Sequence, residues 1–171
     1  LFSLTIHEFA HAWMAMKGGD LTAAYQGRLT FNPLAHLDPI GTMMIVLGAL
    51  TGLSVIGWAK PVPVNAMNFR RASWGMYVAL GGPGSNLALA LVFGLLFRLL
   101  PLLGLSYVGH DQNVRLFYTL ATLFVYSNIC LAIFNMIPVP PLDGSHVFFH
   151  LFVRRRDWVF FWPVLLYLLY F

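Results

Sequence analysis

The sequence predicts an all-α polytopic membrane protein, a bundle of transmembrane helices with short strand-like or re-entrant loops between them. Three observations predict it: 59% of the 171 residues are apolar, only 9% are charged, and the apolar residues gather in long stretches. A soluble domain usually has about a quarter of its residues charged, so this chain could not cover a water-facing surface. We expect a multi-pass integral protein of a bacterial cell membrane, with the lipid bilayer as its solvent and no nucleic acid as partner.

The apolar stretches set the expected helices. A membrane-spanning helix needs about 20 predominantly apolar residues. The third and fourth stretches are long enough, and the second is borderline. The first and last are expected to be truncated spans, all within a single domain over residues 1–171. In chain order, the stretches cover residues 1–16, 40–58, 74–100, 114–137 and 158–171.

Two polar segments between these stretches have strand character. Residues 26–33 (QGRLTFNP) alternate in part and end at a proline, and residues 58–65 (WAKPVPVN) alternate too. The prolines of the second segment suit only an edge strand, because proline cannot donate to a strand ladder. Backbone groups in such loops need partners, so we expect both segments at the membrane interface or inside protein.

The first apolar stretch contains the motif HEFAH, with His7, Glu8 and His11, and Glu8 is the only glutamate of the chain. On a helix the two histidines lie on one face about 6 Å apart, so both rings can reach one ion. Two packed histidines beside a chance glutamate are the plainer interpretation. However, each ionisable group in a bilayer costs roughly 2.5 kcal/mol or more unless it is paired or functional. The motif therefore predicts a metal site.

Zinc is the metal that this arrangement favours. Two histidine ligands with an adjacent glutamate are typical of zinc hydrolases, in which the glutamate takes a proton from metal-bound water. Zinc lowers the pKa of that water to roughly 7, which makes hydroxide available at neutral pH. We therefore predict that His7 and His11 hold one zinc ion per chain and that Glu8 is the general base.

A zinc site needs a third protein ligand. Asp143 is favoured because it follows the fourth apolar stretch in NMIPVPPLDGSHV, where prolines break the helix. A broken helix in a membrane protein is tolerated where it lines a cavity. A helix-end turn with an exposed aspartate stays open as the alternative. The other candidates are Cys130, which lies within an apolar run, and Asp20, Asp38 and Asp111, which suit solvated acids or helix caps.

These motifs together resemble those of a known family. HEFAH, GRLTFNPLAHLDPIGT, GWAKPVPVN, GGPGSN and NMIPVPPLDG follow one another as in the site-2 protease family of intramembrane zinc metalloproteases (M50-type), and specifically as in its short members without a PDZ domain. The resemblance covers nearly the whole chain. It implies that His7, His11 and Asp143 bind zinc. It also implies that Glu8 is the catalytic base and that Asn135 helps to hold the substrate backbone near the scissile bond.

The predicted function is an intramembrane zinc endopeptidase that cleaves transmembrane segments of other membrane proteins. A substrate helix must first unwind, and the strand-like loops could offer an edge to which the unwound segment adds as a strand. A membrane metal or ion transporter and a zinc-dependent membrane lipid amidase stay open as alternatives, although a transporter does not need Glu8 beside His7. The identity of the substrate and the oligomeric state are not indicated by the sequence.

Two further groups of residues have weaker signals. Glycines in GGPGSN suit close helix packing, and Asn86 could bond to a neighbouring helix, with packing favoured over catalysis. A pair of histidines in HVFFH could form a second metal site, although it lacks a glutamate. The glycines are Gly81, Gly82 and Gly84, and the histidines are His146 and His150.

The expected zinc site also constrains the membrane topology. The first helix ends at Lys17, and the basic residues near that end mark its face as cytoplasmic. Asp143 must reach the same zinc, so the fourth stretch must run toward that face too. This holds only if residues 40–58 enter and leave on the cytoplasmic side, as a re-entrant or interfacial segment. The basic residues are Lys17, Arg28, Lys60, Arg70 and Arg71.

Overall fold

The structure is a computed structural model that describes residues 1–52, 59–103 and 112–152. Within these ranges the chain is helical and contains no strand, which confirms the predicted all-α class. The elements in chain order are α1 (Phe2–Gly18), α2 (Thr22–Tyr25), η1 (Pro33–His36), α3 (Pro39–Thr51), η2 (Ala66–Asn68), α4 (Trp74–Leu99), η3 (Leu100–Leu103), α5 (Gln112–Asn135) and α6 (Asp143–Phe152).

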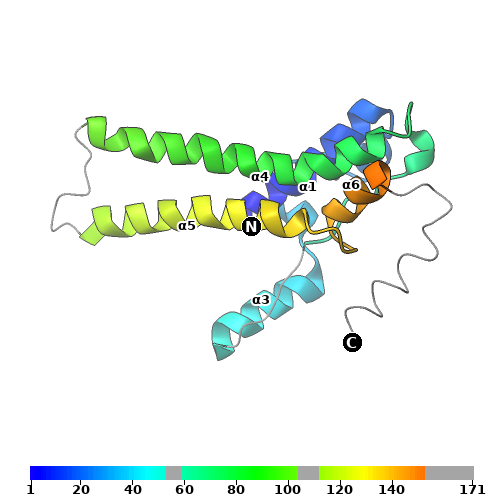
Figure 1. The fold of residues 1–171 in the computed structure, drawn as a ribbon. Helices are drawn as coiled ribbons and strands as arrows, with labels where there is room; N and C mark the ends of the chain where they lie inside the picture. Colours follow the sequence, from blue (N-terminus) through cyan, green and yellow to red (C-terminus); the bar gives the residue numbers. More distant parts are fainter. Residues whose placement is uncertain (53–58, 104–111, 153–171) are drawn as a thin grey trace, which may run out of the picture.

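Helix α4 is the centre of the arrangement and packs against α1, α5 and α6. Figure 1 shows α5 lying alongside α4 in the opposite direction, with α1 beside the N-terminal half of α4. Residues 74–102 and 112–135 form helices that are long and apolar enough to cross a membrane, by length and composition. The helices expected from the third and fourth apolar stretches are therefore present.

The chain returns to the end of α1 before α4 begins. Gly19 adopts a left-handed conformation (φ 107°), which ends α1. The Arg70 backbone N–H donates to the Gly18 carbonyl over 2.9 Å, and the Trp74 ring packs on Gly18. The segment between the two helices thus leaves from and returns to the same end of the α1–α4 pair.

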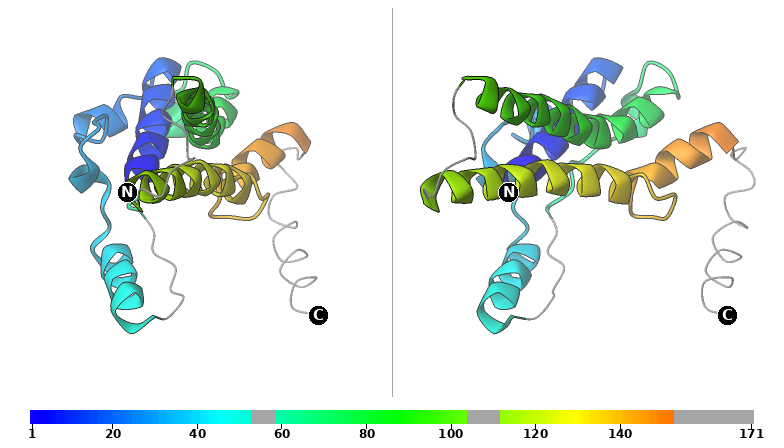
Figure 2. Two further views of the ribbon diagram at one scale, coloured as in Figure 1. Left: turned by 90° about the vertical axis from the view of Figure 1, so that its left-hand side faces the viewer. Right: turned by 60° about the vertical axis from the view of Figure 1, so that its left-hand side comes forward.

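Helix α3 projects away from the other helices (Figures 1 and 2). Asp38 caps its first turn by accepting from the N–H groups of Ile40 and Gly41, and Gly52 ends it with φ 69°. Its 13 residues extend for about 20 Å, which is less than the thickness of a bilayer core. The rest of the segment expected to re-enter, residues 53–58, lies outside the described residues, as does the last apolar stretch.

The strand character predicted for residues 26–33 is wrong, and that predicted for residues 58–65 is found only in part, over the described residues 59–65. Gly27, at φ 67°, turns the chain at the start of residues 26–33, and Asn32 then caps η1. Residues 59–65 are extended, but their only pairing with another extended segment is an isolated antiparallel bridge between Ala59 and Leu37. Prolines at positions 61 and 63 remove the donors that a ladder would need, and side chains bind much of the remaining backbone instead.

Candidate metal centre

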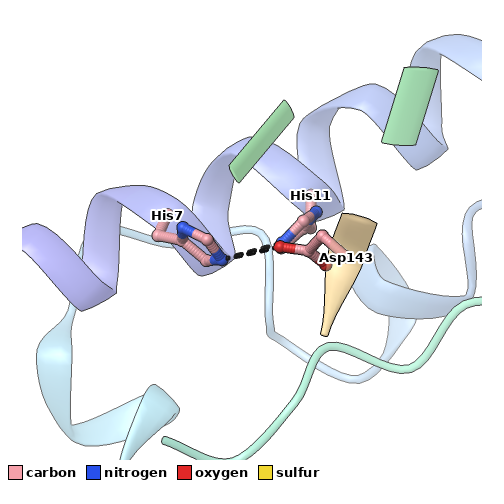
Figure 3. Close-up of side chains that lie close together, drawn as sticks. All are labelled: His7, His11 and Asp143. Carbon is pink, nitrogen blue, oxygen red and sulfur yellow. Dashed lines mark hydrogen bonds and ion pairs between the residues drawn. The ribbon is translucent and has the colours of Figure 1, made fainter. Parts of the chain in front are cut away.

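Helix α1 presents His7 and His11 to one point. The rings lie one helical turn apart, as the spacing of the motif requires, and their Nε2 atoms are 3.0 Å apart. Both residues are buried, with exposed fractions of 4% and 8%. In Figure 3 both rings are directed toward the carboxylate of Asp143, which approaches from another part of the chain.

Asp143 reaches the histidines because the chain breaks after α5. Residues 136–142 form turns, and α6 then begins at Asp143 itself. Its Oδ2 lies 3.2 Å from Nε2 of His7 and 3.2 Å from Nε2 of His11. Gly144 permits this approach, because an added Cβ would lie 2.7 Å from the Ile137 carbonyl oxygen and closer still to that of Met136.

The spacing of Nε2 of His7, Nε2 of His11 and Oδ2 of Asp143 fits the coordination of a zinc ion. Zinc at about 2.0–2.1 Å from each of three tetrahedral ligands would separate those ligands by about 3.3 Å, close to the separations of 3.0, 3.2 and 3.2 Å observed here. Oδ2 of Asp143 is buried without a hydrogen-bond partner among the described residues. Two neutral imidazoles and a carboxylate are also a donor set that zinc favours. Among the described residues, these three form the only group of three or more side chains spaced to hold a metal.

The other nitrogen of each histidine ring has an oxygen partner. Nδ1 of His11 lies 2.7 Å from the backbone carbonyl of Val78, and Nδ1 of His7 lies 2.6 Å from Oδ1 of Asn86. A backbone carbonyl can only accept, so His11 carries its hydrogen on Nδ1 and exposes the Nε2 lone pair. The predicted bond from Asn86 to a neighbouring helix is confirmed, since Asn86 bonds to His7 of α1 and to Asn128 of α5.

Glycine in α4 provides the space for both rings. A Cβ at Gly82 would lie 2.6 Å from Nε2 of His7 and even closer to Nε2 of His11. The close packing expected of the glycines holds at Gly82 and at Gly81, which lies against Met14. It is wrong for Gly84, where an added Cβ would meet no described atom within 4 Å.

A cavity of about 420 Å³ lies beside the three side chains, and Glu8 and Asn135 contribute to its wall. Oε2 of Glu8 accepts a hydrogen bond of 3.1 Å from the backbone N–H of Val62. Pro61, Val62 and Val64 line the cavity. The cavity therefore has α1 on one side and the extended segment of residues 59–65 on another.

Two charged residues, Arg28 and Asp20, hold that segment in place by hydrogen bonds that the sequence did not predict. The buried guanidinium of Arg28 donates to the carbonyl oxygens of Ala35, Lys60 and Pro61. This role of Arg28 is not visible in the sequence, because two of its partners are the backbone carbonyls of Lys60 and Pro61, more than 30 residues away. No local pattern identifies such partners.

Asp20 is the second of these residues and is fully buried. Its carboxylate accepts from Thr22, from the Asn68 side chain and from the Asn65 backbone N–H. Burial alone would raise the pKa of Asp20, but these hydrogen bonds more than offset that effect and hold the pKa below its ordinary value. Asp20 was expected to be a solvated acid or a helix cap. It instead forms a buried connection between the end of α1 and residues 65–68.

The remaining candidates lie apart from the cluster. Cys130 is exposed on α5, and Asp38 is the cap of α3. His146 lines the cavity, but no group of three potential ligands includes it or His150 among the described residues. Asp111 lies outside the described residues.

Comparisons with known proteins point to one family. The model of "Peptidase family M50" matches residues 101–161. "Putative zinc metalloprotease YwhC" of Bacillus subtilis is 40% identical over 149 residues, which is 86% of this chain and 64% of that protein. "Putative zinc metalloprotease Rip2" of Mycolicibacterium smegmatis is 32% identical over 147 residues, 84% of this chain and 52% of that protein. The chain thus spans between half and two thirds of the length of these relatives. No solved structure matches it.

Proposed function

The chain belongs to peptidase family M50, and we propose from this premise that it is an intramembrane zinc endopeptidase that cleaves transmembrane segments of other proteins. One observation carries the proposal. Nε2 of His7, Nε2 of His11 and Oδ2 of Asp143 form a triangle with sides of 3.0 to 3.2 Å at the wall of a cavity that Glu8 also lines. The two relatives, both named as zinc metalloproteases, agree with the proposal in metal and in reaction.

The residues of the cavity divide the chemistry between them. His7, His11 and Asp143 would hold a zinc ion, and when bound it would supply Lewis acidity for polarising a carbonyl and for activating water near neutral pH. Glu8 would accept a proton from the attacking water and then deliver it to the leaving amine. Its Oε2 stays oriented by the Val62 N–H, so Oε1 is the atom that carries the proton.

The extended segment of residues 59–65 is the part of the cavity wall suited to an unwound substrate. Arg28 already binds the carbonyl oxygens of Lys60 and Pro61, and the Lys60 N–H donates to His36. The Val62 N–H is also occupied, since it donates to Glu8. Pairing with a substrate is therefore directed to the Val62 carbonyl and to the backbone of Val64, two residues that line the cavity. Asn135, on another wall of the cavity, is suited to hold the substrate backbone from a second side.

The direction of the helices supports a multi-pass topology with a re-entrant segment at residues 40–58. In Figure 1, α1 and α5 run in the same general direction and α4 runs opposite to both. The hydrogen bond from Arg70 to Gly18 brings the start of α4 to the end of α1. The intervening residues therefore make no net crossing, and α5 returns Asp143 to the depth of the histidines.

The test is cleavage of single-span membrane proteins in vesicles that contain the purified protein and zinc. The wild-type protein should cleave at least one member of a panel within its transmembrane segment. Glu8→Gln should retain stoichiometric zinc and lose cleavage by a factor of about 100 or more, because it removes the proton acceptor. A wild-type protein that moves zinc across the vesicle membrane, or hydrolyses a lipid amide, and cleaves no protein would contradict the proposal.

A further inference from the structure

A buried chain of hydrogen bonds connects His7 to helix α5. Asn86 of α4 and Asn128 of α5 are both fully buried. Oδ1 of Asn86 lies 2.6 Å from Nδ1 of His7, and Nδ2 of Asn86 donates to Oδ1 of Asn128 over 2.9 Å. Nδ2 of Asn128 in turn donates to the Phe124 carbonyl over 2.9 Å and to the Ser3 hydroxyl over 3.0 Å.

The direction of this chain is determined at its far end. The Phe124 carbonyl can only accept a hydrogen bond, so the atom of Asn128 beside it must be the amide nitrogen. The Oδ1 of Asn128 then faces Asn86 and requires a donor there, which must be the Nδ2 of Asn86. Consequently the Oδ1 of Asn86 faces His7 and requires a hydrogen on Nδ1 of the ring.

A second backbone acceptor gives the same direction. Nδ2 of Asn86 also lies 3.4 Å from the Ser3 carbonyl oxygen, which again can only accept. A neutral imidazole has one N–H, so a hydrogen on Nδ1 leaves Nε2 with its lone pair. That lone pair is directed at Oδ2 of Asp143 and Nε2 of His11, where a cation would lie.

We propose that Asn86 and Asn128 are positioning residues that fix His7 in the form with hydrogen on Nδ1 and thereby present Nε2 to the metal. This inference rests on the proposed function in one respect, namely that His7 is a metal ligand. For His11, the Val78 carbonyl fixes the hydrogen on Nδ1 directly. For His7, Asn86 of α4 and Asn128 of α5 would do the same. Partners of this kind orient ligand rings and commonly change metal affinity by about 10- to 100-fold when they are removed.

The experiment combines two measurements on the whole chain in lipid nanodiscs. Nitrogen NMR of zinc-free, histidine-labelled protein reports which ring nitrogen of each histidine carries hydrogen. Competition with a chelator gives the dissociation constant for zinc. Asn86→Leu should convert His7 to a mixture of both forms and weaken zinc binding by about 10- to 100-fold, while His11 keeps its hydrogen on Nδ1.

Three further variants distinguish a specific effect on the orientation of His7 from a general disturbance of the helix packing. Asn86→Asp keeps an acceptor toward His7 and should restore the Nδ1–H form. Ser85→Ala, at the adjacent position with its hydroxyl bonded to the Gly82 carbonyl of its own helix, should leave both measurements unchanged. Asn128→Leu should shift His7 in the same direction as Asn86→Leu but less, because the Ser3 carbonyl still orients Asn86. If Asn86→Leu does not fold, the same two measurements are made on Asn128→Leu instead.

Unchanged His7 signals and unchanged zinc affinity in Asn86→Leu, or in Asn128→Leu where the first variant does not fold, would overturn the inference and leave the proposed function intact. A wild-type protein that does not bind zinc would instead overturn the proposed function. The NMR measurement is made without zinc, so it would still decide whether the amides orient His7.

Discussion

The two sides of the cavity are built in different ways. On the helical side, formed by α1, α4 and α6, backbone groups are satisfied within helices, and polar side chains are free to orient His7, His11 and Asp143. On the loop side, formed by residues 59–65, most of the order comes from side chains of other segments that bind the backbone, namely those of Arg28, Asp20 and Glu8. The difference suggests separate tasks, with the helical side holding the metal and the loop side holding extended chain.

Gly82→Ala should have the largest effect of the variants that compare the two sides. The added methyl carbon would lie 2.6 Å from Nε2 of His7 and even closer to Nε2 of His11, so both rings would have to move and could not converge on an ion. We expect zinc affinity to fall by about 100-fold or more, at or beyond the upper range for changes to the groups around ligands. Gly84→Ala is the matched control, since its methyl group meets no described atom within 4 Å. Equal zinc content in the two variants would contradict this account of the helical side.

Arg28→Met should affect the loop side alone. The variant leaves the carbonyl oxygens of Lys60 and Pro61 without their donor, so residues 59–65 lose their position beside Glu8. A displacement of about 1 Å can cost about 100-fold in rate, and we expect cleavage to fall by about 10- to 100-fold with zinc content unchanged. Arg71→Met, at an exposed position, is the control. Loss of zinc in Arg28→Met would show that the two sides are not separable.

Asp20→Asn should have the smallest effect, on stability. The folded protein holds the pKa of Asp20 below its ordinary value, so the ionised carboxylate contributes stability above about pH 3.9. That contribution is lost as the pH falls through the lowered pKa of the folded state. Asn cannot accept all the donors that Asp20 binds, and a loss of about 1 kcal/mol would lower the melting temperature by about 2–4 °C.

Thermal unfolding of Asp20→Asn and the wild type between pH 7 and pH 3 measures this contribution. The difference in melting temperature should be constant near neutral pH and should shrink toward the acid end. A difference that grows as the pH falls would have the wrong sign and would rule out the ionised carboxylate as its source.

Sequence alone predicted the parts of the molecule that depend on local spacing. Two histidines four residues apart must share a helix face, and an apolar run of more than 20 residues forms a helix wherever lipid is the solvent. Asp143 was favoured as the third ligand because prolines precede it, and the structure brings it within 3.2 Å of both histidines. Its role as a ligand, and those of Glu8 and Asn135, stay predictions until they are measured.

Interactions across the chain could not be predicted in the same way. Asn86 and Asn128 are separated by 42 residues, and the choice between packing and a functional bond for Asn86 depends on which helix faces it. Residues 26–33 and 59–65 alternate like strands, yet a turn at Gly27 and bonds from Arg28 replace the ladder. Alternation reports which side chains are buried and does not report which groups satisfy the backbone.

X-ray absorption at the zinc edge, combined with metal analysis, tests the central claim most directly. The account predicts about one zinc per chain, with two imidazole nitrogens at about 2.0–2.1 Å, oxygen ligands and no sulfur, and loss of most of the metal in Asp143→Ala. A protein purified with zinc available that binds none, or a zinc–sulfur distance of about 2.3 Å that disappears in Cys130→Ser, would contradict it.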